Sequence, residues 1–169
     1  QLAPGSYTNQ TGEVFPLVVK EGVTLLGESS TKGQRMAIIG GGSFASPTAA
    51  GQNITILAQN NSEINGITIT NPNSRGTGVW VESTNPAIRN NTFSNSNREG
   101  VFVTGTGNPK IEDNVFSKNA GNGISVTRQS TGEIRNNLIQ ETGTGIALTG
   151  TAAPLITDNR IVQNDDGII

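Results

Sequence analysis

Two aromatic side chains, Trp80 and Phe102, are the residues of this sequence best suited to holding a sugar. Each sits in the middle of an alternating triplet, Val79-Trp80-Val81 and Val101-Phe102-Val103. In a β-strand the flanking valines point to one side and the ring to the other, so rings whose valines face a core lie on the outer surface. An exposed ring beside polar groups can stack on a sugar ring. The sequence therefore predicts a carbohydrate platform at this place.

Three charged residues accompany the two rings. Glu82 follows Trp80 by two residues and so shares its face, while Arg75 and Arg98 precede the two strands in the loops that lead into them. The predicted substrate-binding set is Trp80, Phe102, Glu82, Arg75 and Arg98. One alternative remains open at this point: the N-terminal segment, or a part of a longer parent chain, covers the rings.

The strands that would position this platform come from a repeat of 22 to 24 residues. Each repeat has apolar residues at alternating positions, with no helical period of 3.6, and it is rich in Ile, Val and Thr rather than Leu. This favours a β-solenoid over a leucine-rich repeat. The main columns of equivalent residues are Ile64, Ile88, Ile111, Ile134 and Ile156; Ile69, Phe93, Phe116, Ile139 and Ile161; and Val79, Val101, Ile124, Ile146 and Ile168.

The predicted fold is all-β: a single-stranded parallel β-helix of about six to seven coils, in which each coil pairs with the next. It forms one domain, residues 1–169, with irregular coils and loop insertions in 1–53 and regular coils in 54–169. Within the irregular part we expect strands near residues 15–19, 23–26 and 36–39, and loops at 28–35 and 43–53. The chain begins without Met and ends within a repeat, so we expect a longer parent chain.

Two polar columns are expected at the bends. Asn91, Asn114, Asn137 and Asn159 predict an asparagine ladder, because Asn tolerates the left-handed conformation and its amide can bond to the coils above and below. Gly78, Gly100, Gly123, Gly145 and Gly167 predict a second bend, with positive φ or close packing. A third column, Arg89, Glu112 and Arg135, places opposite charges one coil apart, which we interpret as surface registry.

Composition excludes several classes of function. The formal net charge of −2 and the absence of a basic face argue against a nucleic-acid partner. No apolar run reaches the length of a membrane span, and the sequence has no Cys and therefore no disulfide.

The repeat resembles the right-handed parallel β-helices of the pectate-lyase-like superfamily, and in particular the carbohydrate-binding and sugar-hydrolase repeats of NosD-like periplasmic proteins. Residues 63–169 carry the likeness through their Asn-x-Phe/Ile and Gly-Val/Ile-x-Val columns. The N-terminal part is similar to a bacterial domain of unknown function in the same superfamily, through Pro4-Gly5-Ser6-Tyr7, residues 12–17 and residues 22–27. The resemblance implies a right-handed fold, a secreted, periplasmic or cell-surface location and a role connected with polysaccharides.

The catalytic groups of related enzymes are not matched here. Polygalacturonase-like hydrolases use clustered Asp plus His, mannuronan-epimerase-like enzymes use Asp-Pro-His, and pectate lyases use acidic Ca²⁺ ligands. This sequence has no His, and we interpret Asp113 and Asp158 as bend residues and Asp165-Asp166 as a solvated loop. The threonines do not form the paired columns of an ice-binding surface. We therefore predict no catalytic residue, no metal site and no cofactor.

The predicted function is a non-catalytic carbohydrate-binding or structural scaffold module of a secreted or cell-surface bacterial protein. The partner is a polysaccharide or cell-surface glycan, and the open strand edge at Ile169 could also stack on another copy or on the rest of a parent chain. The alternative is a polysaccharide lyase or glycoside hydrolase that acts on acidic polysaccharide, with catalytic residues partly outside this chain. The sequence does not identify the glycan.

Overall fold

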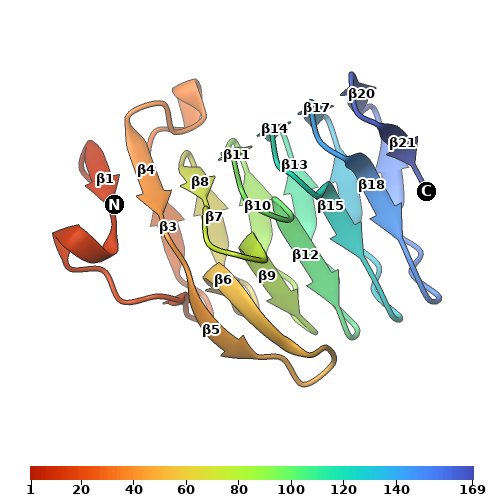
Figure 1. Ribbon diagram of the computed structural model, residues 1–169, viewed down its shortest axis with the longest axis horizontal. Helices are drawn as coiled ribbons and strands as arrows, with labels where there is room; N and C mark the ends of the chain where they lie inside the picture. The colour runs from red at the N-terminus through yellow and green to blue at the C-terminus, as the bar shows by residue number, and fades with distance from the viewer.

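The chain forms a parallel β-helix in which three sheets run side by side along its length. The computed structural model describes residues 1–169, and its strands advance from the N-terminal end to the C-terminal end in a single direction (Figure 1). Each pass around the helix contributes one short strand to each sheet, and strands of successive passes pair in parallel. The predicted all-β parallel solenoid is therefore confirmed.

Sheet A has seven strands and sheet C has six. The strands of sheet A are β1 (Gly5–Tyr7), β4 (Met36–Ile39), β8 (Thr68–Thr70), β11 (Thr92–Ser94), β14 (Val115–Ser117), β17 (Leu138–Gln140) and β20 (Arg160–Val162). Those of sheet C are β3 (Thr24–Leu26), β7 (Glu63–Asn65), β10 (Ala87–Arg89), β13 (Lys110–Glu112), β16 (Glu133–Arg135) and β19 (Leu155–Thr157).

Sheet B has eight strands and carries the predicted platform. Seven are parallel: β2 (Leu17–Val19), β6 (Gly51–Ala58), β9 (Gly76–Glu82), β12 (Val101–Thr104), β15 (Asn122–Val126), β18 (Thr144–Leu148) and β21 (Asp166–Ile168). The eighth, β5 (Gly42–Ala45), pairs with β6 in the antiparallel direction. Two short 3-10 helices, η1 (Asn9–Thr11) and η2 (Ser29–Thr31), lie in the N-terminal part.

The winding has about five regular turns, fewer than the six to seven coils predicted. From β7 onward each sheet receives five strands, one per turn. The two earlier passes are irregular because they carry two insertions, one containing η2 and the other the antiparallel pair of β5 and β6. The second insertion was predicted to be a loop at 43–53, but it contains β5 and the start of β6.

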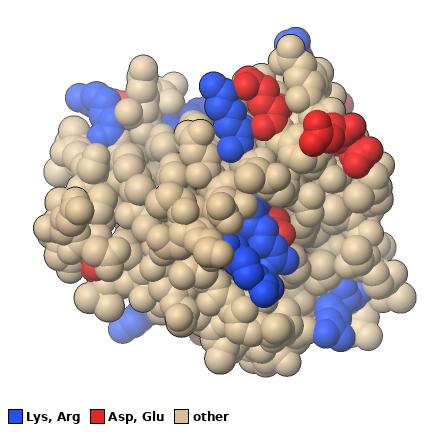
Figure 2. Space-filling view, in the orientation of Figure 1, with Lys and Arg blue, Asp and Glu red and all other residues tan.

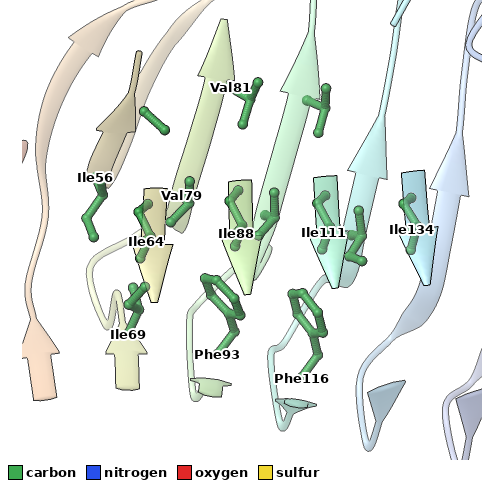
Figure 3. Packing of buried hydrophobic residues seen from close by; sticks show 14 of the residues in the cluster. Ile56, Ile64, Ile69, Val79, Val81, Ile88, Phe93, Ile111, Phe116 and Ile134 are labelled. Carbon is green, nitrogen blue, oxygen red and sulfur yellow. The ribbon is translucent and has the colours of Figure 1, made fainter. Parts of the chain in front are cut away.

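The predicted apolar columns form one continuous core up to the last turn, where Ile156 and Ile161 are partly buried and Ile168 is exposed. Ile64, Ile88 and Ile111 are fully buried and stack in register from β7 to β13 (Figure 3). Phe93 and Phe116 stack with ring centres 4.7 Å apart. Because identical positions repeat on every turn, each side chain packs on a similar one above and below it.

The asparagine ladder is confirmed, with one correction to its geometry. The backbone N–H of Asn91 donates to Oδ1 of Asn114, and that of Asn114 donates to Oδ1 of Asn137, both at 3.0 Å. Each amide also donates to a carbonyl of an earlier strand, as Asn114 does to Ile88 at 2.9 Å. The left-handed conformation belongs instead to the residue before each ladder position, for example Asp113, with φ 58°.

A second ladder at the bend between sheets A and B was not predicted. The backbone N–H groups of Asn71 and Ser96 donate to the side chains of Ser96 and Asn119, each at 3.1 Å. Thr142 and Asn164 continue the same column at 2.9 Å. The residue type changes from turn to turn, so the column is harder to recognise in the sequence than the asparagine ladder.

Close packing, and not positive φ, requires glycine in the predicted glycine column at every turn but the last, where Gly167 has open space around it. Gly78, Gly100, Gly123, Gly145 and Gly167 are absent from the residues with positive φ. A Cβ at Gly100 would lie 2.6 Å from the ring of Phe116 and 2.9 Å from the carbonyl oxygen of Gly123. This column lets the chain turn tightly from the second ladder into sheet B, directly before the residues of the site.

Neither of the two short 3-10 helices, η1 and η2, is long and apolar enough to cross a membrane.

Candidate functional site

The two predicted platform rings do lie on the outer side of sheet B, but they are not exposed. Trp80 on β9 and Phe102 on β12 stack with ring centres 4.3 Å apart and an interplanar angle of 1°. However, Trp80 is 0% exposed and Phe102 is 9% exposed. The prediction of an exposed aromatic platform is therefore wrong for Trp80, and a bare sugar-stacking surface is absent here.

The rings are covered by the hairpin at residues 42–52, which we call the strap. It consists of β5, the turn after it and the start of β6, and it lies across the outer face of sheet B (Figure 1). Phe44 meets Trp80 edge-on at 6.3 Å, and Ile54 completes a second small core with the two rings. The alternative that the N-terminal segment covers the rings is confirmed.

Glu82 fastens the strap to sheet B. Its carboxylate accepts hydrogen bonds from Oγ of Ser46 at 2.5 Å, from Oγ1 of Thr48 at 2.7 Å and from Nε1 of Trp80 at 2.9 Å. Thr48 also bonds to Thr104 on β12 at 2.8 Å. The polar group predicted to face a sugar therefore has three of its roughly four acceptor positions occupied by the protein itself.

The two predicted arginines have different positions. Arg98 joins the strap to sheet B: its Nη1 donates to Gln52 at 2.9 Å, and its guanidinium carbon lies 5.6 Å from the ring centre of Phe102. Its Nε is 2.8 Å from a carboxylate oxygen of Glu99. Arg75 is exposed in the loop before β9 and forms no ion pair. Its backbone N–H donates a hydrogen bond to Oδ1 of Asn97.

Glu99 is a part of this site that the sequence reasoning missed. Its side chain is 3% exposed and accepts a hydrogen bond from Oγ1 of Thr77 at 2.7 Å. Burial raises the pKa of its carboxyl, and the opposing effects of Arg98 and Thr77 are smaller. Thr77, Glu99, Asn122 and Thr144 form one column directly before the glycine column, and that alignment is the signal that could have located Glu99.

Beyond the strap, β15, β18 and the positions that follow them carry small polar side chains, which we call the polar strip: Asn122, Ser125, Thr127, Thr144 and Thr149. Asn122, Thr127 and Thr149 are accessible to solvent, whereas Ser125 and Thr144 are 3% and 8% exposed. The amide of Asn122 donates to Oγ of Ser125 at 2.9 Å, so the two groups are held in fixed positions. Arg98 lies before this strip and Arg128 directly follows Thr127. Figure 2 shows charged groups in small, separate clusters on a face that is otherwise uncharged.

The acidic residues of the chain do not assemble into a metal site. No group of three or more His, Cys, Asp or Glu side chains is placed to hold an ion. Asp113 and Asp158 have φ of 58° and 56°, which agrees with their interpretation as bend residues. Glu112 pairs with Arg135 at 3.0 Å as expected from the charged column, whereas Arg89 lies 4.0 Å from Glu63 instead.

Comparison with known proteins gives a family but no characterised relative. Residues 1–169 match the family described as "Protein of unknown function (DUF1565)". No curated protein and no solved structure matches the chain. Because the match covers the whole chain, the protein belongs to the DUF1565 family.

Proposed function

We propose that this protein is a non-catalytic carbohydrate-binding module and that it holds a glycan along the polar strip of sheet B. The observation that carries the proposal is the strip itself. It presents the amide of Asn122 and the hydroxyls of Thr127 and Thr149 from neighbouring turns, which lie about 4.7–4.9 Å apart in a sheet, beside a floor of Ser125 and Ala147, which are 3% and 8% exposed. Fixed groups of this kind can exchange hydrogen bonds with sugar hydroxyls without ordering flexible side chains.

The strap supports the proposal by making this part of the face rigid. It removes the two rings from solvent and anchors itself to Glu82, Thr104 and Arg98. It also holds the side chain of Arg98, which is 31% exposed, beside Phe102, the ring that precedes Ser125 in the same column of sheet B. A glycan on the strip would lie beside these two side chains.

The proposal also includes the cellular location of the protein and its relationship to other β-helix proteins. The Asn-x-Phe/Ile and Gly-Val/Ile-x-Val columns support a kinship with pectate-lyase-like and NosD-like β-helices. They also support a role as a secreted, periplasmic or cell-surface module that binds polysaccharide or serves as a scaffold. Recovery of the protein from the cytoplasmic fraction of its host would argue against this location.

The test is a glycan array followed by titration calorimetry on the best ligand. Thr127→Ala and Asn122→Ala each remove a group from the strip, and we expect a loss of affinity of about fivefold for each, the value of one hydrogen bond. Thr157→Ala on sheet C is the matched control, since Thr157 is also half-buried but lies on another sheet. Equal affinities in all three variants and in the wild type would contradict the proposal.

One observation favours a second candidate function, the cleavage of acidic polysaccharide. Glu99 is a buried carboxyl whose pKa is raised by that burial, a property that general acids use. If Glu99 acts in this way, Glu99→Gln abolishes the release of reducing or unsaturated ends from uronic-acid polymers. A wild-type protein that releases no such ends would remove this candidate.

A further inference from the structure

A hollow lies at the end of the polar strip, beside the strap. It has a volume of about 370 Å³ and lies between the turn of the strap and the bends that follow β9, β12 and β15. No hydrophobic residue lines it. The groups that it presents include Thr48, Ser83, Thr106, Arg128 and Gln129.

The charge of this hollow distinguishes it from the other hollows on the surface. There are four hollows in all. One is apolar with Glu13 at its margin, one contains Lys110 together with Glu133, and one has no charged residue. Only the hollow beside the strap contains a cation, Arg128, without an acidic residue in its lining. Arg128 also takes part in none of the ion pairs of the structure.

The side chain of Arg128 has no equivalent side chain directly above or below it in the neighbouring turns. Arg128 is in the left-handed region with φ 64°, and the equivalent positions one turn before and one turn after it are Gly105 and Gly150, with φ 71° and 73°. These two glycines have no side chain to fill the space. A Cβ on Gly105 would lie 2.0 Å from Oγ of Ser83, so a side chain at this position would displace Ser83, which also lines the hollow.

The guanidinium is oriented by the strap and keeps most of its donors free. Its Nη2 donates to the carbonyl oxygen of Thr48. A guanidinium has five N–H donors, so four remain for a ligand. A planar fork of N–H groups matches an oxyanion, and the hydroxyl groups of the hollow match the hydroxyls of a sugar ring.

The geometry points to this hollow as a subsite for an anionic sugar, in which Arg128 binds the oxyanion of one unit of the glycan. This inference rests on the proposed carbohydrate binding and adds to it the class of sugar. The oxyanion is either the carboxylate of a uronic acid or a sulfate ester. The charge and the hydrogen bonds are common to both, and the ligands used in the test distinguish them.

The experiment measures binding by titration calorimetry for three sets of oligosaccharides: oligogalacturonates, their neutral methyl esters, and sulfated galactose oligomers. The main variant is Arg128→Gly, which removes the guanidinium but suits the left-handed backbone, as Gly105 and Gly150 show. Arg128→Lys keeps the charge without the planar fork. Arg160→Ala, at another exposed and unpaired arginine on β20, is the control.

We expect Arg128→Gly to weaken binding of an anionic oligosaccharide by about tenfold or more, with an intermediate loss for Arg128→Lys and none for Arg160→Ala. The neutral esters should bind equally to the wild type and to Arg128→Gly. The anionic set that shows the loss identifies the oxyanion. Anionic binding that is unchanged in Arg128→Gly, or reduced equally in Arg160→Ala, would overturn the inference. Binding of neutral sugars alone would overturn it and leave the proposed function standing, whereas no binding by any of the three sets would contradict both.

Discussion

At the scale of single residues, the core of this molecule consists of columns of side chains that stack one above another, one residue per turn. The isoleucine and phenylalanine columns pack in register because a β-helix places equivalent positions directly above one another, so the residue type at one turn predicts that at the next. The direction of Trp80 and Phe102 also followed from alternation. Their burial did not, because alternation states which side of a sheet a residue faces and says nothing about what covers it.

The asparagine ladder gives a prediction about stability. Asn114 is 1% exposed, and its side chain bonds to Asn91, Ile88 and Asn137. Asn114→Ala leaves buried main-chain groups without partners, and we expect a loss of about 3 kcal/mol or more in the free energy of unfolding. Urea denaturation measures this change.

Asn159→Ala is the matched control for the ladder, because Asn159 is half-buried and water can reach the groups that it bonds. We expect it to cost less than half as much. Equal losses for the two variants would show that the ladder is not held by the buried hydrogen bonds that we describe.

The raised pKa of Glu99 predicts a dependence of stability on pH. Since burial raises this pKa in the folded state, the folded protein binds the proton more tightly than the unfolded chain does. The favourable contribution of Glu99 is complete below about pH 4.3, the pKa of an unstructured glutamate, and is lost as the pH rises through the folded-state value. The free energy of unfolding of the wild type should therefore fall relative to that of Glu99→Gln between pH 4 and pH 7.

Chemical denaturation of both proteins across this pH range checks the prediction, and the other carboxyl groups cancel because both proteins carry them. Arg98 and Thr77 oppose the shift and so reduce its size without changing its sign. A difference between the two proteins that stays constant with pH, or that changes in the opposite direction, would contradict the assignment.

At the scale of elements, the strap is the feature that the sequence did not predict. The period of 22 to 24 residues predicts strands that recur, whereas β5 is an antiparallel strand that occurs once and pairs with β6. Residues 43–53 are rich in Ser and Ala, contain Pro47 and Gly51, and were predicted to be a loop. The strands near 15–19, 23–26 and 36–39 were predicted from short apolar runs next to glycines, and β2, β3 and β4 lie there.

Trp80 is the only tryptophan of the chain, so its fluorescence reports on the strap. Glu82→Ala removes the acceptor of Ser46, Thr48 and Trp80. We expect the emission of Trp80 to move to longer wavelength, its quenching by acrylamide to increase, and the free energy of unfolding to fall by about 2–4 kcal/mol.

Glu141→Ala removes a more exposed carboxylate, which lies 3.9 Å from Lys118 at the bend after sheet A, and should leave the emission unchanged. If Glu82→Ala also leaves the emission and the quenching of Trp80 unchanged, the carboxylate of Glu82 does not hold the strap over the ring.

At the scale of the whole molecule, the β-helix was predictable because its repeat is a property of the sequence as well as of the fold. The hydrogen-bonded ladders, the inward columns and the bends all recur at one spacing. The site was less predictable because it depends on elements that do not recur: the strap, the buried carboxyl of Glu99 and the single arginine at a bend where the other turns have Ser83, Gly105 and Gly150.

The central claim is that one face of the molecule, the open part of sheet B, binds a glycan. The most direct measurement is the NMR chemical shift of each backbone amide during titration with the best oligosaccharide from the glycan array. We predict that the amides of Ser125, Thr127 and Arg128 shift and that those of sheets A and C do not. Shifts confined to sheets A and C would contradict the claim, as would a titration that moves no resonance.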